Sequence, residues 1–465
     1  MTAATVPPPT RSYRTVNPAT DEVVQEFPTL TDKEAEAALE RADHAYRSWR
    51  HTPVGERVRL FRRFVELFEA NADELARLTT LEMGKPTPYA AAEISMVTAI
   101  FNYYADHAEE LLADEPIEVA GLSKIYTRRE PIGVVLGIEP WNAPLYQAMR
   151  AAAPNLMLGN TVLLKPSELT AGSTLLLDAL FTQAGFPADV YQTVLVSTEQ
   201  VSAYLADPCI RAVTLTGSDR AGSMVGEQAG RHIKPVVLEL GGSDAFIVLD
   251  SADVAAAAAT AAACRLVIGG QVCISPKRLI LTEAVADEFI ARFTDAWSDQ
   301  KVGDPFDPET TVGPLSSTAA ADLLQEQYQD AIDKGATVLL PGGRVDGPGA
   351  FFRPAVITDL SPDMRLYYEE AFGPLAMIHR VRDADAAVAL ANNSEYGLSG
   401  SVFAEDLEDA LSVAQRLDTG SVGINTWYPA PVEAPFGGTK RSGVGRELGR
   451  TGMDQFANIK TYAVS

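Results

Sequence analysis

Short apolar runs alternate with amphipathic segments through the middle of the chain. Runs rich in Val and Leu occur at 133–138, 161–165, 191–196, 212–216 and 236–240. Helical patterns lie between them, near 144–158, 170–184, 199–206 and 219–230. Buried apolar strands that alternate with helices are typical of a parallel, doubly wound sheet. We therefore predict an α/β fold, in which ligands bind at the carboxyl ends of the strands.

A second alternating series begins after Gly241 and Gly242. Its strands are expected near 245–249, 278–282, 337–340, 354–358, 375–380, 398–403 and 420–425. This pattern predicts a second α/β domain. The segment 437–449 is rich in Gly and charge, which is typical of a long irregular loop. The tail 455–464 has the pattern of a last strand, and because a terminal strand needs a partner, it indicates subunit pairing.

Two helices are predicted in the part of the chain before the first apolar run. Thr31 and Glu34 form a capping-box pattern at the start of a helix over 31–50. Thr52 and Pro53 begin one long amphipathic helix, whose apolar face includes Leu60, Phe64, Leu67, Phe68, Leu75 and Leu78. The first ten residues lack the basic and apolar regions of a signal peptide. No apolar run approaches the ~18 residues of a membrane span, so we expect a cytoplasmic protein.

Composition excludes several classes of function. The chain has 465 residues, a formal net charge of −24 and three cysteines. This length suggests two or three domains. The acidic charge argues against nucleic acid or an anionic membrane as partner. Three cysteines cannot form a disulfide framework, and without CxxC or HExxH patterns no metal site is expected.

Cys273 is the strongest candidate for a nucleophile. It follows a Gly-Gly-Gln-Val run, which is poor core material but lets the backbone approach a ligand closely. A thiol on such a turn can be partly ionised by nearby N–H groups. The alternative is a buried, inert cysteine, as we expect of Cys209 and Cys264. None of the five histidines has a catalytic signature, so a carboxylate must serve as the base.

Glu239 is the candidate base. It lies inside the apolar run Val-Val-Leu-Glu-Leu, directly before a Gly-Gly pair at a predicted strand end. Desolvation there would raise its pKa into the range of a useful base. The alternative is a structural ion pair. Asn142 follows Pro140 and Trp141 after another strand, where its amide could stabilise an oxyanion or simply form a turn.

Two further strand ends carry groups suited to a dinucleotide. Lys165 and Glu168 end the next strand, where they could hold ribose hydroxyl groups. A Thr-Gly-Ser run joins a strand to a helix, with a glycine in the first turn of that helix, which is a ready site for phosphate. Its residues are Thr216, Gly217, Ser218 and Gly222. Because carboxyl ends of parallel strands meet at one edge, these groups are expected to lie together.

In this order and spacing, the motifs resemble those of the aldehyde dehydrogenase superfamily, and most closely those of succinate-semialdehyde dehydrogenases. The motifs are at 140–142, 165–168, 216–218, 238–242, 270–273, 370–374 and 435–438. The resemblance implies a Rossmann-like NAD(P)-binding domain, an α/β catalytic domain and a small β oligomerisation element. The corresponding ranges are 1–112 with 131–240, 241–437, and 113–130 with 438–465. It also implies a homodimer or homotetramer.

The resemblance further assigns roles to residues. It implies that the Cys273 thiolate attacks the aldehyde, that Asn142 and the Cys273 N–H hold the oxyanion, and that Glu239 activates water to hydrolyse a thioester. The implied cofactor contacts are Trp141, Lys165, Glu168, Thr216, Gly217, Ser218, Gly222, Leu240, Glu370 and Phe372. Glu239 favours hydrolysis over transfer to coenzyme A. Glu168 favours NAD because a carboxylate repels a 2′-phosphate, with NADP kept as the alternative.

The resemblance also suggests the substrate. Arg150 lies eight residues after Asn142, where succinate-semialdehyde dehydrogenases place an arginine that could pair with a substrate carboxylate. Tyr146 and Arg265 are further candidate contacts, although the arginine that many members carry six residues before the cysteine is Val267 here. A neutral aldehyde, a cofactor-free hydrolase and a non-catalytic binding protein remain as alternatives, and a structural salt bridge is the alternative for Arg150.

Overall fold

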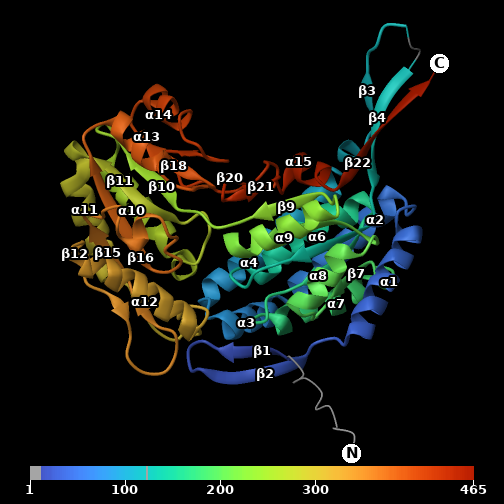
Figure 1. Ribbon diagram of the computed structural model, residues 1–465, viewed down its shortest axis with the longest axis horizontal. Helices are drawn as coiled ribbons and strands as arrows, with labels where there is room; N and C mark the ends of the chain where they lie inside the picture. The colour runs from blue at the N-terminus through green and yellow to red at the C-terminus, as the bar shows by residue number, and fades with distance from the viewer. Residues whose placement is uncertain (1–11, 122–123, 465) are drawn as a thin grey trace, which may run out of the picture.

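The computed structural model describes residues 12–121 and 124–464 (Figure 1). The first ten residues, for which the sequence predicts no signal peptide, lie outside this part of the chain. Two β-sheets, each made mainly of parallel strands and surrounded by helices, form the two halves of the body. Among the helices of the described part, none is long and apolar enough to cross a membrane.

The first sheet confirms the predicted parallel, doubly wound arrangement. Its order is β21-β9-β8-β5-β6-β7, in which β5 to β9 run parallel and β21 is antiparallel to β9. The strands are β5 (Val134–Ile138), β6 (Thr161–Lys165), β7 (Tyr191–Thr193), β8 (Ile210–Thr216), β9 (Val236–Glu239) and β21 (Gly443–Val444). The helices between them are α6 (Pro144–Leu158), α7 (Ala171–Ala184), α8 (Thr198–Ala206) and α9 (Asp219–Arg231). Because the strand order reverses between β5 and β8, a ligand crevice is expected above these two strands.

The N-terminal elements pack beside this sheet. They are β1 (Ser12–Asn17), β2 (Glu22–Pro28), α1 (Asp32–Trp49), α2 (Val54–Ala70), α3 (Ala72–Met83), α4 (Thr87–Asp106) and α5 (Ala108–Leu111). The predicted capping box of Thr31 and Glu34 is confirmed at α1. The single long helix predicted from Thr52 is wrong, because Asn71 separates α2 from α3. Its backbone leaves the helical conformation, and its side chain donates to the Leu67 carbonyl at 2.7 Å.

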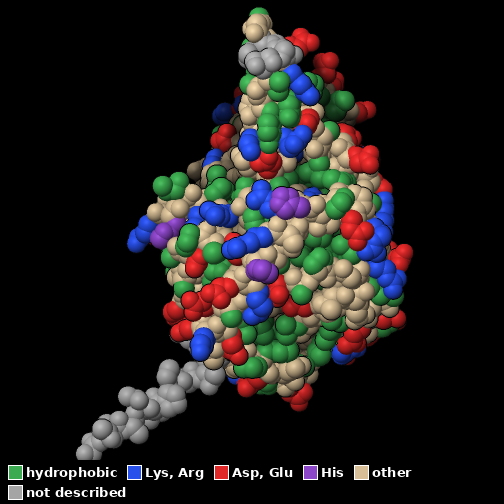
Figure 2. Space-filling view, turned by 90° about the vertical axis from the view of Figure 1, so that its right-hand side faces the viewer, with side chains coloured by type: hydrophobic (Ala, Val, Ile, Leu, Met, Phe, Trp, Pro, Cys, Tyr) green, Lys and Arg blue, Asp and Glu red, His purple; other side chains and the backbone are tan. Residues whose placement is uncertain are grey.

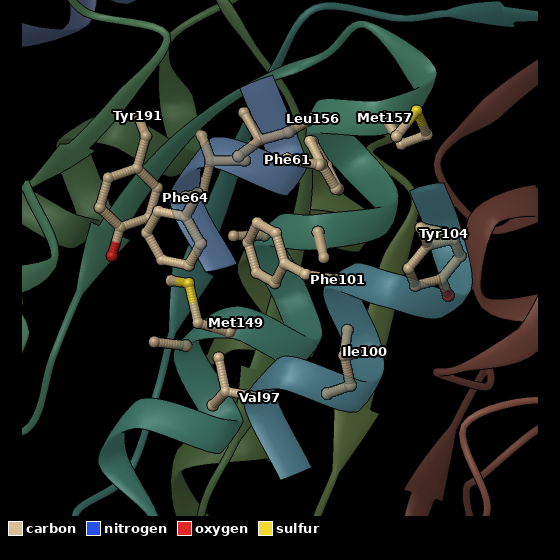
Figure 3. Packing of buried hydrophobic residues seen from close by; sticks show 14 of the residues in the cluster. Phe61, Phe64, Val97, Ile100, Phe101, Tyr104, Met149, Leu156, Met157 and Tyr191 are labelled. Carbon is tan, nitrogen blue, oxygen red and sulfur yellow. The ribbon is translucent and has the colours of Figure 1, made fainter. Parts of the chain in front are cut away.

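The core of this half is built around α6, which is buried along its whole length. Figure 3 shows aromatic side chains of α2 and α4 packed against it. The rings of Phe64 and Phe101 stack with centroids 4.4 Å apart, and Met149 and Leu156 of α6 belong to the same cluster. Removing such large side chains typically costs ~3–5 kcal/mol. The cluster therefore fixes the helix that follows Asn142.

A buried ion pair anchors the start of α6. Glu93 accepts hydrogen bonds from the backbone N–H groups of Leu145 and Tyr146, both at 2.8 Å. Lys85 pairs with the same carboxylate, and both side chains are almost fully buried. A carboxylate at a helix N-terminus satisfies free N–H groups and complements the helix dipole.

The second sheet confirms the second α/β series. Its order is β12-β15-β16-β11-β10-β18-β19, and β12 is antiparallel to β15. The strands are β10 (Asp244–Val248), β11 (Pro276–Thr282), β12 (Thr337–Leu340), β15 (Ala355–Thr358), β16 (Leu375–Val381), β18 (Gly400–Phe403) and β19 (Gly423–Ile424). The helices are α10 (Val254–Leu266), α11 (Glu283–Ser298), α12 (Thr318–Asp333), α13 (Ala384–Asn392) and α14 (Leu407–Ala414), with 3-10 turns η1 (Val267–Gly270) and η2 (Arg365–Tyr367). Short strand pairs are β13 (Gly343–Arg344) with β14 (Phe352–Arg353), and β17 (Tyr396–Gly397) with β20 (Thr439–Lys440).

A three-stranded arm projects from the body (Figure 1). It contains β3 (Glu115–Ile117), β4 (Lys124–Pro131) and β22 (Ala457–Val464), and α15 (Gly449–Asp454) precedes β22. The pairing of β4 with β22 confirms the predicted contact between 113–130 and the terminal strand. Figure 2 shows hydrophobic and basic side chains on the arm. Among them, Tyr126 and Tyr462 stack with centroids 5.0 Å apart beside Arg128.

The sequence predicted an irregular loop over 437–449. This prediction is wrong in part, because the segment contributes β20 and β21. Gly443 explains why pairing with β9 is allowed. A Cβ atom there would lie 1.8 Å from the Leu238 carbonyl oxygen, and the φ of Gly443 is +132°. The glycine-rich segment can therefore form a strand here because Gly443 has no side chain that would clash with β9.

Candidate active site

A cavity of about 370 Å³ lies where the strands of the first sheet end and the second sheet begins. Asn142 enters from the loop after β5, Thr216 from the end of β8 and Glu239 from the end of β9. Cys273 comes from the turn between η1 and β11. The full lining is Pro140, Trp141, Asn142, Gln147, Thr216, Gly217, Ser218, Asp219, Glu239, Leu240, Gly241, Cys273, Leu323, Glu370, Phe372 and Tyr396. The structure thus brings the three predicted catalytic side chains to one cavity.

The turn that carries Cys273 has an unusual backbone. Ile268, Gly269 and Gly270 all have positive φ angles, and a Cβ at Gly270 would lie 2.3 Å from the Gly373 carbonyl oxygen. Gln271 holds the turn rather than lining the cavity. Its side chain donates to the Ile268 carbonyl and accepts from the backbone N–H of Ser316, at 3.1 and 2.9 Å. Strain of this kind persists where neighbouring structure holds it.

Cys273 itself is partly exposed. Burial raises the pKa of its thiol to about 12, while nearby Lys277 and Arg150 act in the opposite direction. The thiol is therefore protonated at neutral pH, and a nucleophilic role requires a proton acceptor.

Asn142 presents an amide beside this turn. Its Nδ2 donates to the Gln271 carbonyl at 3.0 Å, and its Oδ1 has no partner among the described residues. An amide nitrogen has two N–H donors, so one remains for a ligand in the cavity.

Glu239 is 2% exposed, and neither of its side-chain oxygens has a hydrogen-bond partner within the described chain. Burial raises the pKa of Glu239 well above the ordinary value, and the nearby Glu447 carboxylate raises it further. Arg150 and Arg446 act in the opposite direction. A carboxylate held in this way readily accepts a proton.

A buried charge network lies behind Glu239. Arg150 of α6 pairs with Glu447, and each side chain is 3% exposed. Glu447 also accepts from Thr214 of β8 at 3.0 Å, and Arg150 donates to Thr216 at 3.2 Å. Glu139, at the end of β5, has a pKa raised by burial and by Glu447. The network supports the salt-bridge alternative for Arg150.

The predicted substrate contacts do not line the cavity. Arg150 is held by Glu447, and its guanidinium lies over the Tyr146 ring at 5.3 Å. Tyr146 is 6% exposed. Arg265 contradicts the prediction most clearly, because it is fully buried and donates to the carbonyls of Gly270, Ala371, Gly373 and Leu375. It ties the η1 turn to β16 and has no free face for a substrate.

The groups predicted to hold a dinucleotide follow strand ends, as expected. Ser218 caps α9 by accepting from the Ala221 N–H. A Cβ at Gly222, in the first turn of α9, would lie 2.5 Å from the Leu240 side chain, which would have to shift. Lys165 and Glu168 lie outside the cavity lining, at the end of β6. Burial lowers the pKa of Lys165, and its ammonium lies 5.3 Å from the Tyr13 ring.

Glu370 and Phe372 line the same cavity. The rings of Phe372 and Trp141 meet edge to face with centroids 5.7 Å apart. The Glu370 carboxylate accepts from the Gly242 N–H at 3.2 Å and pairs with Lys277 at 2.9 Å.

Sequence reasoning missed several residues of the site. Gln147 lines the cavity at 4% exposure, and its side-chain oxygen has no partner among the described residues. Because all of α6 is buried, amphipathic periodicity could not single out this position. Glu447 lies in the segment 437–449, which the sequence predicted to be a loop. Its role becomes clear only from its contact with Arg150 in the structure. Lys277 offered a signal, since a lysine next to an apolar strand is unusual.

The sequence suggested that Cys209 and Cys264 are buried and inert. In the structure both side chains are partly exposed. Neither lines the cavity. Burial raises the pKa of both thiols, that of Cys264 to about 11. A protonated thiol away from the cavity agrees with their prediction as unreactive residues.

Comparison with known proteins places this geometry in context. The model of the aldehyde dehydrogenase family matches residues 6–462. A succinate-semialdehyde dehydrogenase of Deinococcus radiodurans, whose name specifies NADP(+), is 51% identical over 97% of this chain and 94% of its own length. A protein of the same name from Mycobacterium tuberculosis is 45% identical over 97% and 99%.

Solved structures agree with the fold. Succinic semialdehyde dehydrogenase from Streptococcus pyogenes, in complex with NADP+, has a TM-score of 0.95 at 38% identity, covering 97% of this chain and 99% of that one. A salicylaldehyde dehydrogenase from Pseudomonas putida G7 has a TM-score of 0.93 at 33% identity, covering 98% and 95%.

Proposed function

Since the chain belongs to the aldehyde dehydrogenase family, we propose that it oxidises succinate semialdehyde to succinate with NADP+. The observation that carries the proposal is that Cys273, Asn142 and Glu239, from three separate segments, line one cavity. Covalent capture by a thiol divides a difficult oxidation into two easier steps.

In the proposed reaction, the Cys273 sulfur bonds to the aldehyde carbon, and its proton passes to Glu239. The free N–H of Asn142 and the Cys273 backbone N–H stabilise the oxyanion. The nicotinamide, when bound, supplies the acceptor for the hydride that leaves this carbon. Glu239 releases this proton to solvent and then removes a proton from water, which attacks the resulting thioester. The Cys273–carbon bond breaks, the sulfur takes the second proton from Glu239, and the thiol and the carboxylic acid are released.

The residues present fit a dinucleotide. The N-terminus of α9, which Ser218 caps, offers N–H groups for the pyrophosphate, and Thr216 and Gly217 line the cavity beside it. The aromatic pair Trp141 and Phe372 and the Leu240 side chain offer apolar contacts within the same cavity. Glu370 and, farther along, Lys165 would hold the two riboses.

The sequence favoured NAD through Glu168, whereas the names of the relatives favour NADP+. Glu168 is exposed, so its carboxylate can turn into solvent and is screened from a 2′-phosphate. We therefore take NADP+ as the preferred cofactor, with NAD+ used less well.

Recognition of the substrate carboxylate is assigned to Gln147. This amide shares the cavity with Cys273, whereas Arg150 is engaged by Glu447. A neutral amide can donate two hydrogen bonds to a carboxylate. A neutral aldehyde is the second candidate substrate, supported by the engagement of Arg150 and by the likeness to salicylaldehyde dehydrogenase.

We also propose the division into a cofactor domain (1–112 and 131–240), a catalytic domain (241–437) and an oligomerisation element (113–130 and 438–465). The contact of β4 with β22 supports the last of these. The projecting arm, on which Tyr126 and Tyr462 stack, suits pairing with a second copy, in a homodimer or homotetramer.

The test uses the purified chain with NADP+ or NAD+ and a panel of succinate semialdehyde, butanal and benzaldehyde. Reduced cofactor is followed by absorbance. We expect the highest kcat/KM for succinate semialdehyde with NADP+, loss of activity in Cys273→Ala and full activity in the control Cys264→Ala. Equal or better turnover of butanal would favour the second candidate. Activity that survives Cys273→Ala would contradict the mechanism.

A further inference from the structure

Lys277 is a fully buried lysine with no assigned role. It lies on β11, where every residue is buried, and its side chain is 0% exposed. An ammonium in such a place is very costly unless all its donors are satisfied. Here three N–H donors meet three acceptors. The Nζ atom lies 2.9 Å from the Val272 carbonyl, 2.6 Å from the Cys273 carbonyl and 2.9 Å from Oε1 of Glu370.

These acceptors come from two separate segments that meet at the cavity. The two carbonyls are part of the turn that presents the Cys273 thiol. Glu370 lines the cavity together with Phe372, whose ring centre is 5.8 Å from the Lys277 ammonium. One side chain therefore bridges the nucleophile turn and the wall that would contact the cofactor.

We propose that Lys277 is a positioning residue that fixes the Cys273 turn and the Glu370 carboxylate relative to each other. The part concerning Glu370 and the cofactor rests on the proposed function, whereas the hold on Cys273 does not. Without the ammonium, two carbonyls and a carboxylate would converge without a cation between them, and mutual repulsion would move both the turn and the wall.

The electrostatic surroundings of Cys273 agree with this role. Lys277 and Arg150 stabilise the thiolate, whereas Glu370 and Asp244 destabilise it. Lys277 has the largest stabilising effect of these groups. Asp244, on the neighbouring strand β10, is held by Ser399, with its N–H donating at 3.1 Å. Loss of Lys277 therefore leaves Cys273 with two acids and with Arg150, the cation that has the smaller effect on it.

The test follows alkylation of Cys273 by iodoacetamide without cofactor, by mass spectrometry of its peptide, from pH 6 to pH 10. In Lys277→Met we expect alkylation at pH 8 to be at least about tenfold slower, with the pH profile displaced upward by about one unit, because the thiolate loses the cation that stabilises it most. The Cys264 peptide of the same sample is the internal control and should be unchanged. Glu370→Gln should not slow alkylation, since it removes a negative charge and leaves Lys277 on both carbonyls.

Binding of NADP+, measured by titration calorimetry, provides the second readout. Both Lys277→Met and Glu370→Gln should weaken it by about tenfold, and the double variant should be no weaker than either single variant, because the two groups act as one unit. A folded Lys277→Met protein with the wild-type alkylation profile and wild-type affinity would overturn the proposal.

If Lys277→Met does not fold, Lys277→Arg takes its place. It keeps the charge, but a planar guanidinium cannot match the three converging acceptors. We expect a lower kcat with little displacement of the alkylation pH profile, and unchanged kcat and KM would overturn the proposal. Failure of the wild-type protein to oxidise any aldehyde would count against the proposed function instead, since alkylation still reports the hold on Cys273.

Discussion

Arg150→Met tests whether the buried arginine supports the site or contacts the substrate. Arg150 and Glu447 are each 3% exposed and form an ion pair. Removing one partner of a buried pair leaves an uncompensated charge, which typically costs about 3–5 kcal/mol. We therefore expect Arg150→Met to lower the free energy of unfolding by about this amount. Methionine fills most of the volume, so a cavity should contribute little.

The double variant Arg150→Met/Glu447→Gln separates charge from packing. It removes the unpaired carboxylate, while a Gln at 447 still accepts from Thr214. Most of the lost stability should return, because replacing a whole buried pair by neutral groups is often close to neutral. Glu447→Gln alone should be less harmful than Arg150→Met, since Arg150 would still face Glu139 and Glu239.

The assay combines urea unfolding, followed by tryptophan fluorescence, with kinetics on succinate semialdehyde and butanal. A supporting role predicts that Arg150→Met lowers kcat/KM for both substrates by a similar factor. The reason is that Glu239 loses the cation that opposes the rise of its pKa. A variant as stable as the wild-type protein, with a higher KM for succinate semialdehyde alone, would refute this reasoning and restore Arg150 as the carboxylate contact.

Three further changes have distinct outcomes. Glu239→Gln should still release a first burst of reduced cofactor in stopped-flow experiments while steady turnover falls by about 10²-fold or more, because the proposed base for water is lost; unchanged turnover would contradict that role. Gln147→Glu should raise KM for succinate semialdehyde by about tenfold and leave butanal unaffected, through repulsion of like charges, whereas equal effects on both substrates would indicate a structural role. Glu82 of α3 is buried against the start of α7 and has a pKa raised to about 7, mainly by burial. Between the unfolded pKa of about 4.3 and pH 7, the folded state therefore binds more protons than the unfolded state does. The free energy of unfolding should fall as pH rises through this window, by about 3–4 kcal/mol relative to Glu82→Gln. Parallel pH curves of the two proteins in urea unfolding would refute this.

The fold was largely predictable because periodicity reports burial. Parallel strands buried on both faces produce continuous apolar runs, and each such run between 133 and 240 corresponds to a strand or strand end. The break at Asn71 was not predictable, since the apolar face of α2 continues into α3 and the interruption comes from one side-chain hydrogen bond. Pairing of β21 with β9 depends on the absence of a Cβ at Gly443, which periodicity cannot register.

The site divides in the same way. Residues at strand ends, such as Asn142 and Glu239, could be predicted because the topology dictates where strands end. Residues that act through distant partners could not. Arg150 looked like a substrate contact because nothing in the sequence relates it to Glu447. Arg265 looked available because three of its four backbone acceptors are Ala371, Gly373 and Leu375, more than a hundred positions away.

The pairing of β21 with β9 has a consequence for the order in which the protein becomes functional during synthesis. The strand that ends in Glu239 gains its outer neighbour from Gly443 and Val444, and the partner of Arg150 follows at Glu447. Ribosomes deliver these residues about two hundred positions after β9. A nascent chain that has made strands β5 to β9 therefore still has an open edge at β9 and an Arg150 without its partner. Closure of this edge and pairing of this arginine can take place only in the last stage of chain synthesis.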